Sequence, residues 1–133
     1  MLFIYLLEGN PGHVKRVREI LARSYERGDY LCCSYLALGE VMAGASLSRD
    51  PGKAAVIQKA IGEMGFHFLP FDQGAVIPFS RLRAKEKLRA ADAIHLACAA
   101  SADIDLFLTG DKRLIKLSVP GVKFIADMYT PLI

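Results

Sequence analysis

The sequence lacks any apolar run long enough to form a membrane-spanning helix. The longest apolar run near its start, Leu2 to Leu7, falls far short of the roughly 20 residues that a bilayer requires. That run has no basic segment before it and no small-residue cleavage site after it, which argues against a signal peptide. We therefore expect a cytoplasmic protein that makes no contact with a membrane.

Cysteine is also scarce, and its spacing excludes the usual cysteine-based sites. The three cysteines are Cys32, Cys33 and Cys98, and they form no metal-ligand or redox motif. Cys32 and Cys33 are adjacent on a predicted strand, so their side chains point to opposite faces. We interpret all three as small buried hydrophobic residues of a reducing compartment.

A strong excess of charge of either sign is missing as well. The formal net charge of +3 permits a polyanionic partner without requiring one. Hydrophobic residues make up 53% of the chain and charged residues 23%, a balance typical of a compact protein and not of a disordered one. A length of 133 residues suits one domain, which we place at residues 1–133.

The chain does contain an alternation of helical and strand-like segments, with no repeat, low-complexity tract or linker. This order predicts an α/β domain with a mostly parallel sheet. Ser34 is a candidate helix cap, and Pro78 should break or kink its helix. The predicted helices are His13–Arg27, Tyr35–Leu47, Asp50–Met64, Asp72–Lys87, Ala90–Ala102 and a short turn after Asp111; the predicted strands are Tyr30–Ser34, Phe66–Phe71, Asp105–Thr109 and Val122–Ala126.

Asp92 stands out because its surroundings are apolar. It lies in Arg89–Ala100, a segment that is apolar on almost every helical face. A buried carboxylate is costly unless it is paired or bound to a metal, so a partner is expected. The alternative is a carboxylate in the first turn that interacts with the helix dipole.

Glu40 and Asp111 are two further acids in informative positions. Glu40 is the only charge between Asp29 and Arg49, and the alternative for it is a place on a solvated helix face. Asp111 directly follows a predicted strand, at the edge where open parallel sheets bind ligands. The alternative for Asp111 is a turn or helix-cap aspartate.

The three acids share one placement, shortly after a strand or early in a helix. We therefore expect Glu40, Asp92 and Asp111 to converge at one sheet edge. Clustered carboxylates repel one another unless a cation neutralises them. Hard oxygen ligands favour Mg²⁺ or Mn²⁺, and such ions suit the cleavage of phosphodiester bonds.

Histidine and basic residues accompany these acids along the chain. His95 falls one helical turn after Asp92 and shares its face, so it orients Asp92 or contacts substrate, unless it is simply a packed helix histidine. Arg89 precedes this helix, and Lys112 and Arg113 directly follow the third acid. A solvated charged face explains such basic runs, but beside an acidic site they would attract the phosphates of a nucleic acid.

Together these segments resemble the PIN-domain family, especially the VapC-type toxin nucleases of type II toxin–antitoxin pairs. The most specific match is Arg89–Ala100, whose Asp-Ala-Ile-His-Leu-Ala core is similar to the family's third acidic motif. Glu40 matches the acid in the helix after the second strand, and Leu108–Asp111 resembles the fourth motif. Phe3–Pro11 is similar to the helix after the family's first strand. With the other matching segments, the resemblance covers essentially the whole chain.

This resemblance implies a three-layer α/β/α fold and Mg²⁺- or Mn²⁺-dependent cleavage of RNA. It also implies a homodimer that a cognate antitoxin neutralises. By the same resemblance Glu40, Asp92 and Asp111 are catalytic residues and metal ligands, and Thr109 supports them. We add His95 as a further supporting residue, and Arg89, Lys112 and Arg113 as residues that bind substrate.

Two departures from the family pattern have consequences. Gly110 replaces the usual Asn, which is expected to loosen the loop that holds Asp111. The first strand of the family, with its terminal Asp-x-Asn, is missing from the sequence, and that strand is central in the sheet. We hypothesise that Met1 is internal to a longer reading frame, and an upstream frame without Asp-x-Asn would contradict this. For the chain as given we predict impaired folding and weak or no nuclease activity.

Two other interpretations compete with a ribonuclease. A PIN-like module that binds antitoxin or RNA without cutting is favoured by the missing aspartate and disfavoured by the three retained acids. A receiver-type signalling domain would also be α/β with clustered acids. It needs an acceptor aspartate at the end of a strand, whereas Glu40 and Asp92 fall within predicted helices.

Overall fold

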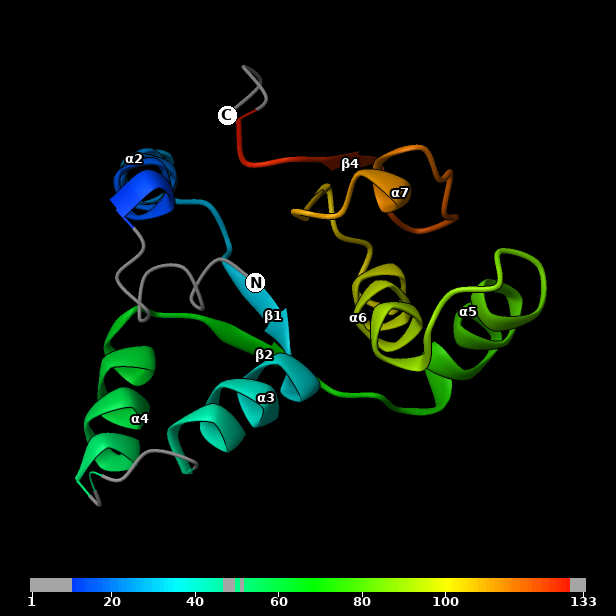
Figure 1. Ribbon diagram of the computed structural model, residues 1–133. Coiled ribbons are helices and arrows are strands. Elements are labelled where there is room, and N and C mark those ends of the chain that lie inside the picture. Colours follow the sequence, from blue (N-terminus) through cyan, green and yellow to red (C-terminus); the bar gives the residue numbers. More distant parts are fainter. Residues whose placement is uncertain (1–10, 47–49, 51, 130–133) are drawn as a thin grey trace.

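The structure is a computed structural model that describes residues 11–46, 50 and 52–129. Helices alternate with short parallel strands (Figure 1), which confirms the α/β character expected from the sequence. The helices are α2 (Pro11–Arg27), α3 (Tyr35–Ser46), α4 (Lys53–Glu63), α5 (Gln73–Ala84), α6 (Ala90–Ser101) and α7 (Lys112–Ile115). The strands are β1 (Cys32–Ser34), β2 (His67–Leu69), β3 (Leu106–Leu108) and β4 (Phe124–Ala126). No helix within the described ranges is long and apolar enough to cross a membrane.

The strands form two parallel pairs instead of the single sheet that we expected. β1 pairs with β2, with Cys33 opposite Phe68, and β3 pairs with β4, with Phe107 opposite Ile125. In Figure 1 the first pair lies with α3 and α4, and the second lies above α5 and α6. The described residues supply no strand between β1 and β3, so the two pairs remain separate. Residues 3–10, which resemble the family's first helix, lie outside the described part of the chain, and the three-layer arrangement stays a prediction.

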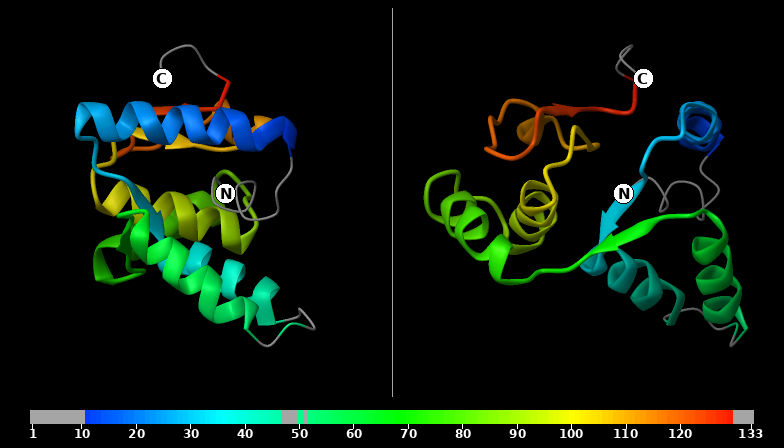
Figure 2. Two further views of the ribbon diagram at one scale, coloured as in Figure 1. Left: turned by 90° about the vertical axis from the view of Figure 1, so that its left-hand side faces the viewer. Right: turned by 180° about the vertical axis from the view of Figure 1, so that it is seen from behind.

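Helix α2 packs against residues from both halves of the chain, and Figure 2 shows it on the side of the molecule opposite α5. Val17, Ile20 and Leu21 are buried at helical spacing and contact Met128. The partly buried residues around this cluster come from both halves of the chain, and they are Leu31, Phe66, Leu106 and Leu108. Tyr25, which also belongs to the predicted apolar face, is 52% exposed, and its hydroxyl donates to the Met64 carbonyl oxygen at 2.7 Å.

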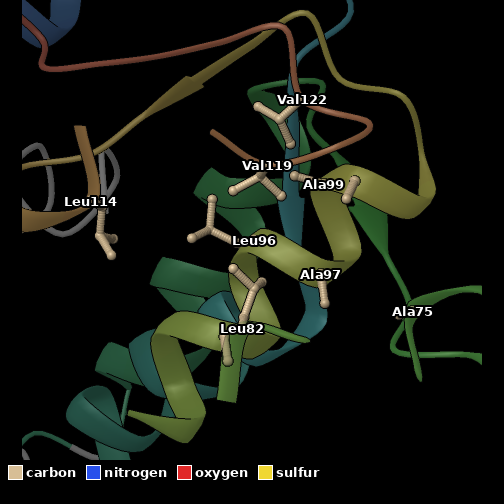
Figure 3. Close-up of a cluster of buried hydrophobic side chains, with 10 residues drawn as sticks. Ala75, Leu82, Leu96, Ala97, Ala99, Leu114, Val119 and Val122 are labelled. Atoms are coloured by element: carbon tan, nitrogen blue, oxygen red, sulfur yellow. The ribbon is translucent and has the colours of Figure 1, made fainter. Parts of the chain in front are cut away.

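The largest hydrophobic cluster is built around α6. This helix is buried on most of its surface, as its composition predicts, and its alanines let neighbouring segments approach closely. Leu82 of α5, Leu114 of α7, and Val119 and Val122 of the following loop pack against it (Figure 3). The N-terminal end of α6 is therefore held firmly, and Asp92 lies there.

Most predicted helix boundaries agree with the structure to within a few residues, but α5 differs in two ways. Pro78 lies inside α5 and does not end it, although proline removes one backbone donor from the helix. The helix ends at Ala84, earlier than predicted, and three residues later Lys87 has a φ of 53°, in the left-handed region. Asp72 caps its start by accepting a hydrogen bond from the Gly74 amide at 3.1 Å.

The cysteines behave largely as the sequence predicts. Cys98 is buried, and Cys32 and Cys33 are half-buried; all three are free thiols. Burial raises the pKa of the Cys33 thiol to about 12, so this side chain is protonated and unreactive at neutral pH.

Candidate functional site

Three separate elements carry the acids singled out from the sequence. Asp92 lies in the first turn of α6, Asp111 follows β3 and caps α7, and Glu40 lies within α3. Their side chains are 19%, 25% and 40% exposed, respectively. Asp92 and Asp111 each pair with an arginine, and Glu40 lies beside His95.

Asp111 is held on both sides by its own loop. Its carboxylate accepts hydrogen bonds from the Arg113 amide at 2.9 Å and from the Arg113 guanidinium at 3.1 and 2.7 Å. Its own amide donates to Thr109 Oγ1 at 3.1 Å, and Thr109 is buried. These contacts place Thr109 where a supporting residue is needed. They also hold Asp111 through residues on both sides of it in the chain, Thr109 and Arg113, although Gly110 led us to expect a looser loop.

Arginine also controls the charge of this site. The hydrogen bonds from Arg113, with a smaller electrostatic effect of Arg89, lower the pKa of Asp111 to about 2. Arg89 itself pairs with Asp92, Nε to Oδ2, at 3.3 Å. The pKa of Arg113 is raised by its bond to Asp111 and to a lesser extent by Asp92. The two aspartates and the two arginines therefore form one cluster of alternating charge at the ends of β3 and α6.

His95, one helical turn after Asp92 on α6, contacts Glu40. Its Nε2 is 3.7 Å from Glu40 Oε2, and its Nδ1 is 2.6 Å from Ser34 Oγ. Burial lowers the pKa of the imidazole, against the opposing effect of Glu40 and, more weakly, of Asp92. The ring is thus neutral at neutral pH, and its direct contact is with Glu40, whereas the sequence suggested Asp92.

The donor chemistry of the acids fits a divalent ion, but their arrangement is less suited to one. Carboxylate oxygens are the ligands that Mg²⁺ and Mn²⁺ prefer. Within the described residues, however, no three acidic, histidine or cysteine side chains are grouped closely enough to hold a metal. Glu40, Asp92 and Asp111 therefore remain candidate ligands, and in this structure they do not form one ligand set.

The predicted substrate-binding residues are all at the surface of this region. Arg89 and Arg113 are 74% and 72% exposed, so each can leave its carboxylate without uncovering a core. Lys112 is exposed at the start of α7, next to Asp111. Arg89 and Arg113 thus lie directly beside Asp92 and Asp111.

Ser34 makes two contacts in this region, and the sequence predicts only the first of them. The sequence marks it as a helix cap, and its hydroxyl does accept a hydrogen bond from the Ala37 amide at 3.1 Å. Its contact with His95 joins residues 61 positions apart, and no local pattern reports such a pair.

Comparison with known families gives a match over most of the chain. The family model of the PIN domain matches residues 2–120, which is most of the chain. A search of the curated proteins found no match.

Proposed function

The chain belongs to the PIN domain family, a family of nucleases, and on this premise we propose that it is a metal-dependent endoribonuclease and the toxin of a type II toxin–antitoxin pair. The observation that carries the proposal is the cluster of Asp92, Asp111, Arg89 and Arg113. The acids and arginines come from two segments that are distant in the sequence, and each segment shifts the pKa of a group in the other: Arg89 lowers that of Asp111, and Asp92 raises that of Arg113. Such a cluster offers oxygen ligands to a cation and guanidinium groups to phosphates.

We assign a distinct role to each group. Asp92 and Asp111, together with Glu40, are the residues that would hold Mg²⁺ or Mn²⁺. When bound, such an ion polarises the scissile phosphate and lowers the pKa of a bound water. Arg89, Lys112 and Arg113 bind the phosphates on either side and set the position of the RNA. Thr109 keeps the Asp111 loop in place through its hydrogen bond to the Asp111 amide.

The activity test is Mn²⁺-dependent cleavage of a mixed pool of structured RNA. We would compare the chain with a form extended upstream in its reading frame, each carrying either Asp92→Ala or Asp105→Ala. Asp105 is a matched control, because it is 79% exposed, pairs with the exposed Lys123, and lies at the opposite end of β3 from Asp111. We expect Asp92→Ala to abolish cleavage and Asp105→Ala to leave it unchanged. Equal cleavage by both variants would contradict the assignment.

A module that binds RNA or an antitoxin without cutting is the second candidate, and the arrangement of the acids favours it. Asp92 and Asp111 are already neutralised by arginines of the same chain, and the described acids do not form a ligand set. In that case neither form would cut RNA at any Mn²⁺ concentration, while both would bind RNA or an antitoxin. The match to the PIN domain argues against the receiver-type signalling domain.

The partners and the compartment follow from the same proposal. We propose a homodimer in the cytoplasm that a cognate antitoxin neutralises, on the strength of the likeness of Arg89–Ala100 to toxin nucleases. Light scattering coupled to gel filtration measures the mass of the particle, and a monomer at micromolar concentration would contradict the homodimer.

A further inference from the structure

Ser34, His95 and Glu40 form a chain of polar contacts that the proposed chemistry does not yet use. Ser34 ends β1 and is 5% exposed, and its hydroxyl lies 2.6 Å from Nδ1 of His95. On the other side of the ring, Nε2 lies 3.7 Å from Oε2 of Glu40. The contacts therefore run from β1 through α6 to the acid on α3.

The hydrogen-bond inventory of Ser34 fixes the direction of this chain. The serine oxygen already accepts a hydrogen bond from the Ala37 amide, as the cap of α3. A buried hydroxyl also needs an acceptor for its hydrogen, and Nδ1 of His95 is the acceptor within reach. When Nδ1 accepts, the single ring hydrogen of a neutral imidazole is on Nε2, which faces Glu40.

This direction matters because Glu40 is otherwise loosely held. Its side chain is 40% exposed, whereas that of His95 is 16% exposed and rises from a helix packed in the main hydrophobic cluster. A flexible glutamate has several accessible rotamers, and a fixed donor beside it favours one of them. A distance of 3.7 Å is longer than a hydrogen bond, so a small rotation of Glu40 brings its carboxylate onto the Nε2 hydrogen.

We propose that Ser34 and His95 are positioning residues for Glu40, in which Ser34 selects the tautomer of His95 and the Nε2 hydrogen of His95 orients the carboxylate. This inference rests on the proposed nuclease function, since the value of a fixed Glu40 lies in its place at the acidic site. It assigns Ser34 a role beyond capping α3.

The first test reads the tautomer directly by ¹H–¹⁵N NMR of the histidine rings at mildly alkaline pH, in the whole chain. We expect the His95 hydrogen on Nε2 in the parent and in Ser34→Thr, which keeps the hydroxyl. Ser34→Gly removes the hydroxyl, and because glycine is itself a favourable helix-cap residue, α3 is retained. In that variant we expect a mixture of both tautomers. A hydrogen on Nδ1 in the parent protein would overturn the proposal, whatever the RNA assay gives.

The second test uses two replacements of His95 that differ in reach. In His95→Gln the amide nitrogen replaces Nε2 and can still donate to Glu40, whereas His95→Asn places its amide near Nδ1, too far from Glu40. For a positioning role we expect kcat for RNA cleavage to fall about tenfold in His95→Asn and Ser34→Gly, with KM unchanged. His95→Gln and Ser34→Thr should stay close to the parent.

The outcomes separate this inference from the nuclease proposal. Equal kcat in His95→Gln and His95→Asn, in a protein that cuts RNA, would overturn the positioning role and leave the nuclease intact. Loss of cleavage in all forms, the parent and its upstream-extended version included, would overturn both.

Discussion

Asp111 and Arg113 show how one short loop sets the charge of a site. The guanidinium and the amide of Arg113 both donate to the same carboxylate, and this is the main reason why the pKa of Asp111 falls to about 2. Since the pKa is lower in the folded state, the pair stabilises the fold above the ordinary aspartate pKa of about 4. That contribution is lost as the pH falls toward 2.

Replacing Arg113 with alanine should therefore raise the pKa of Asp111 toward its ordinary value. The amide hydrogen bond of residue 113 remains in this variant, so the rise should stop below about 4. A carboxyl-carbon NMR titration of Asp111 measures the shift. Arg18→Ala, at an exposed position on α2, is the control and should leave the titration unchanged. An unchanged midpoint in Arg113→Ala would show that the guanidinium does not hold this carboxylate in solution.

At the scale of elements, the loop before β4 is fitted closely against α6. Gly121 has a φ of 95°, and a Cβ atom there would lie 2.5 Å from the Ala100 carbonyl oxygen. The contact is with backbone, which cannot swing aside as a flexible side chain could. The close approach lets Val119 and Val122 reach the hydrophobic cluster of α6.

Gly121→Ala should accordingly lower the free energy of unfolding by about 1–3 kcal/mol, through left-handed strain and overpacking. Gly62→Ala is the matched control, because Gly62 lies in α4 with nothing within 4 Å of an added Cβ. In that helix alanine should stabilise by up to about 1 kcal/mol. Urea unfolding followed by circular dichroism measures both changes. A loss of stability in Gly62→Ala equal to that in Gly121→Ala would contradict the close-contact argument.

At the scale of the whole molecule, the hydrophobic residues that the structure describes form three clusters instead of one. One surrounds α6, one joins α2 to Met128, and a third lies between α3 and α4 around Val41 and Ile61. Among the described strands, β1 pairs only with β2 and β3 only with β4. Within the described residues, one edge of β1 and one edge of β3 therefore have no strand partner.

A form extended upstream by the strand that the family resemblance implies should pair with both of these edges. We expect slower hydrogen exchange at the amides of β1 and β3 and a higher melting temperature, because the added strand satisfies backbone groups and joins the clusters. Hydrogen exchange followed by mass spectrometry compares the two forms, with α4 as an internal reference. Exchange that is equally fast in β1 and β3 of both forms would contradict the missing-strand hypothesis.

The elements themselves follow from local signals in the sequence. Helical spacing predicts the buried face of α2, the apolar composition of Arg89–Ala100 predicts a buried α6, and both Ser34 and Asp111 are recognisable caps. Such features depend on neighbours within a few positions, so the sequence reports them. The end of α5 was less predictable, because Pro78 lies inside the helix and the left-handed Lys87 follows its end.

By itself, the sequence determined which residues form helices and strands and which acids are candidate ligands, because periodicity, caps and composition act over short distances. Only the tertiary structure decided that arginines pair with Asp92 and Asp111, that His95 contacts Ser34 and Glu40, and that the strands form two pairs. The physical reason is that these contacts depend on how whole helices pack. A side chain's partner across 61 residues is fixed by that packing and not by its neighbours in the chain.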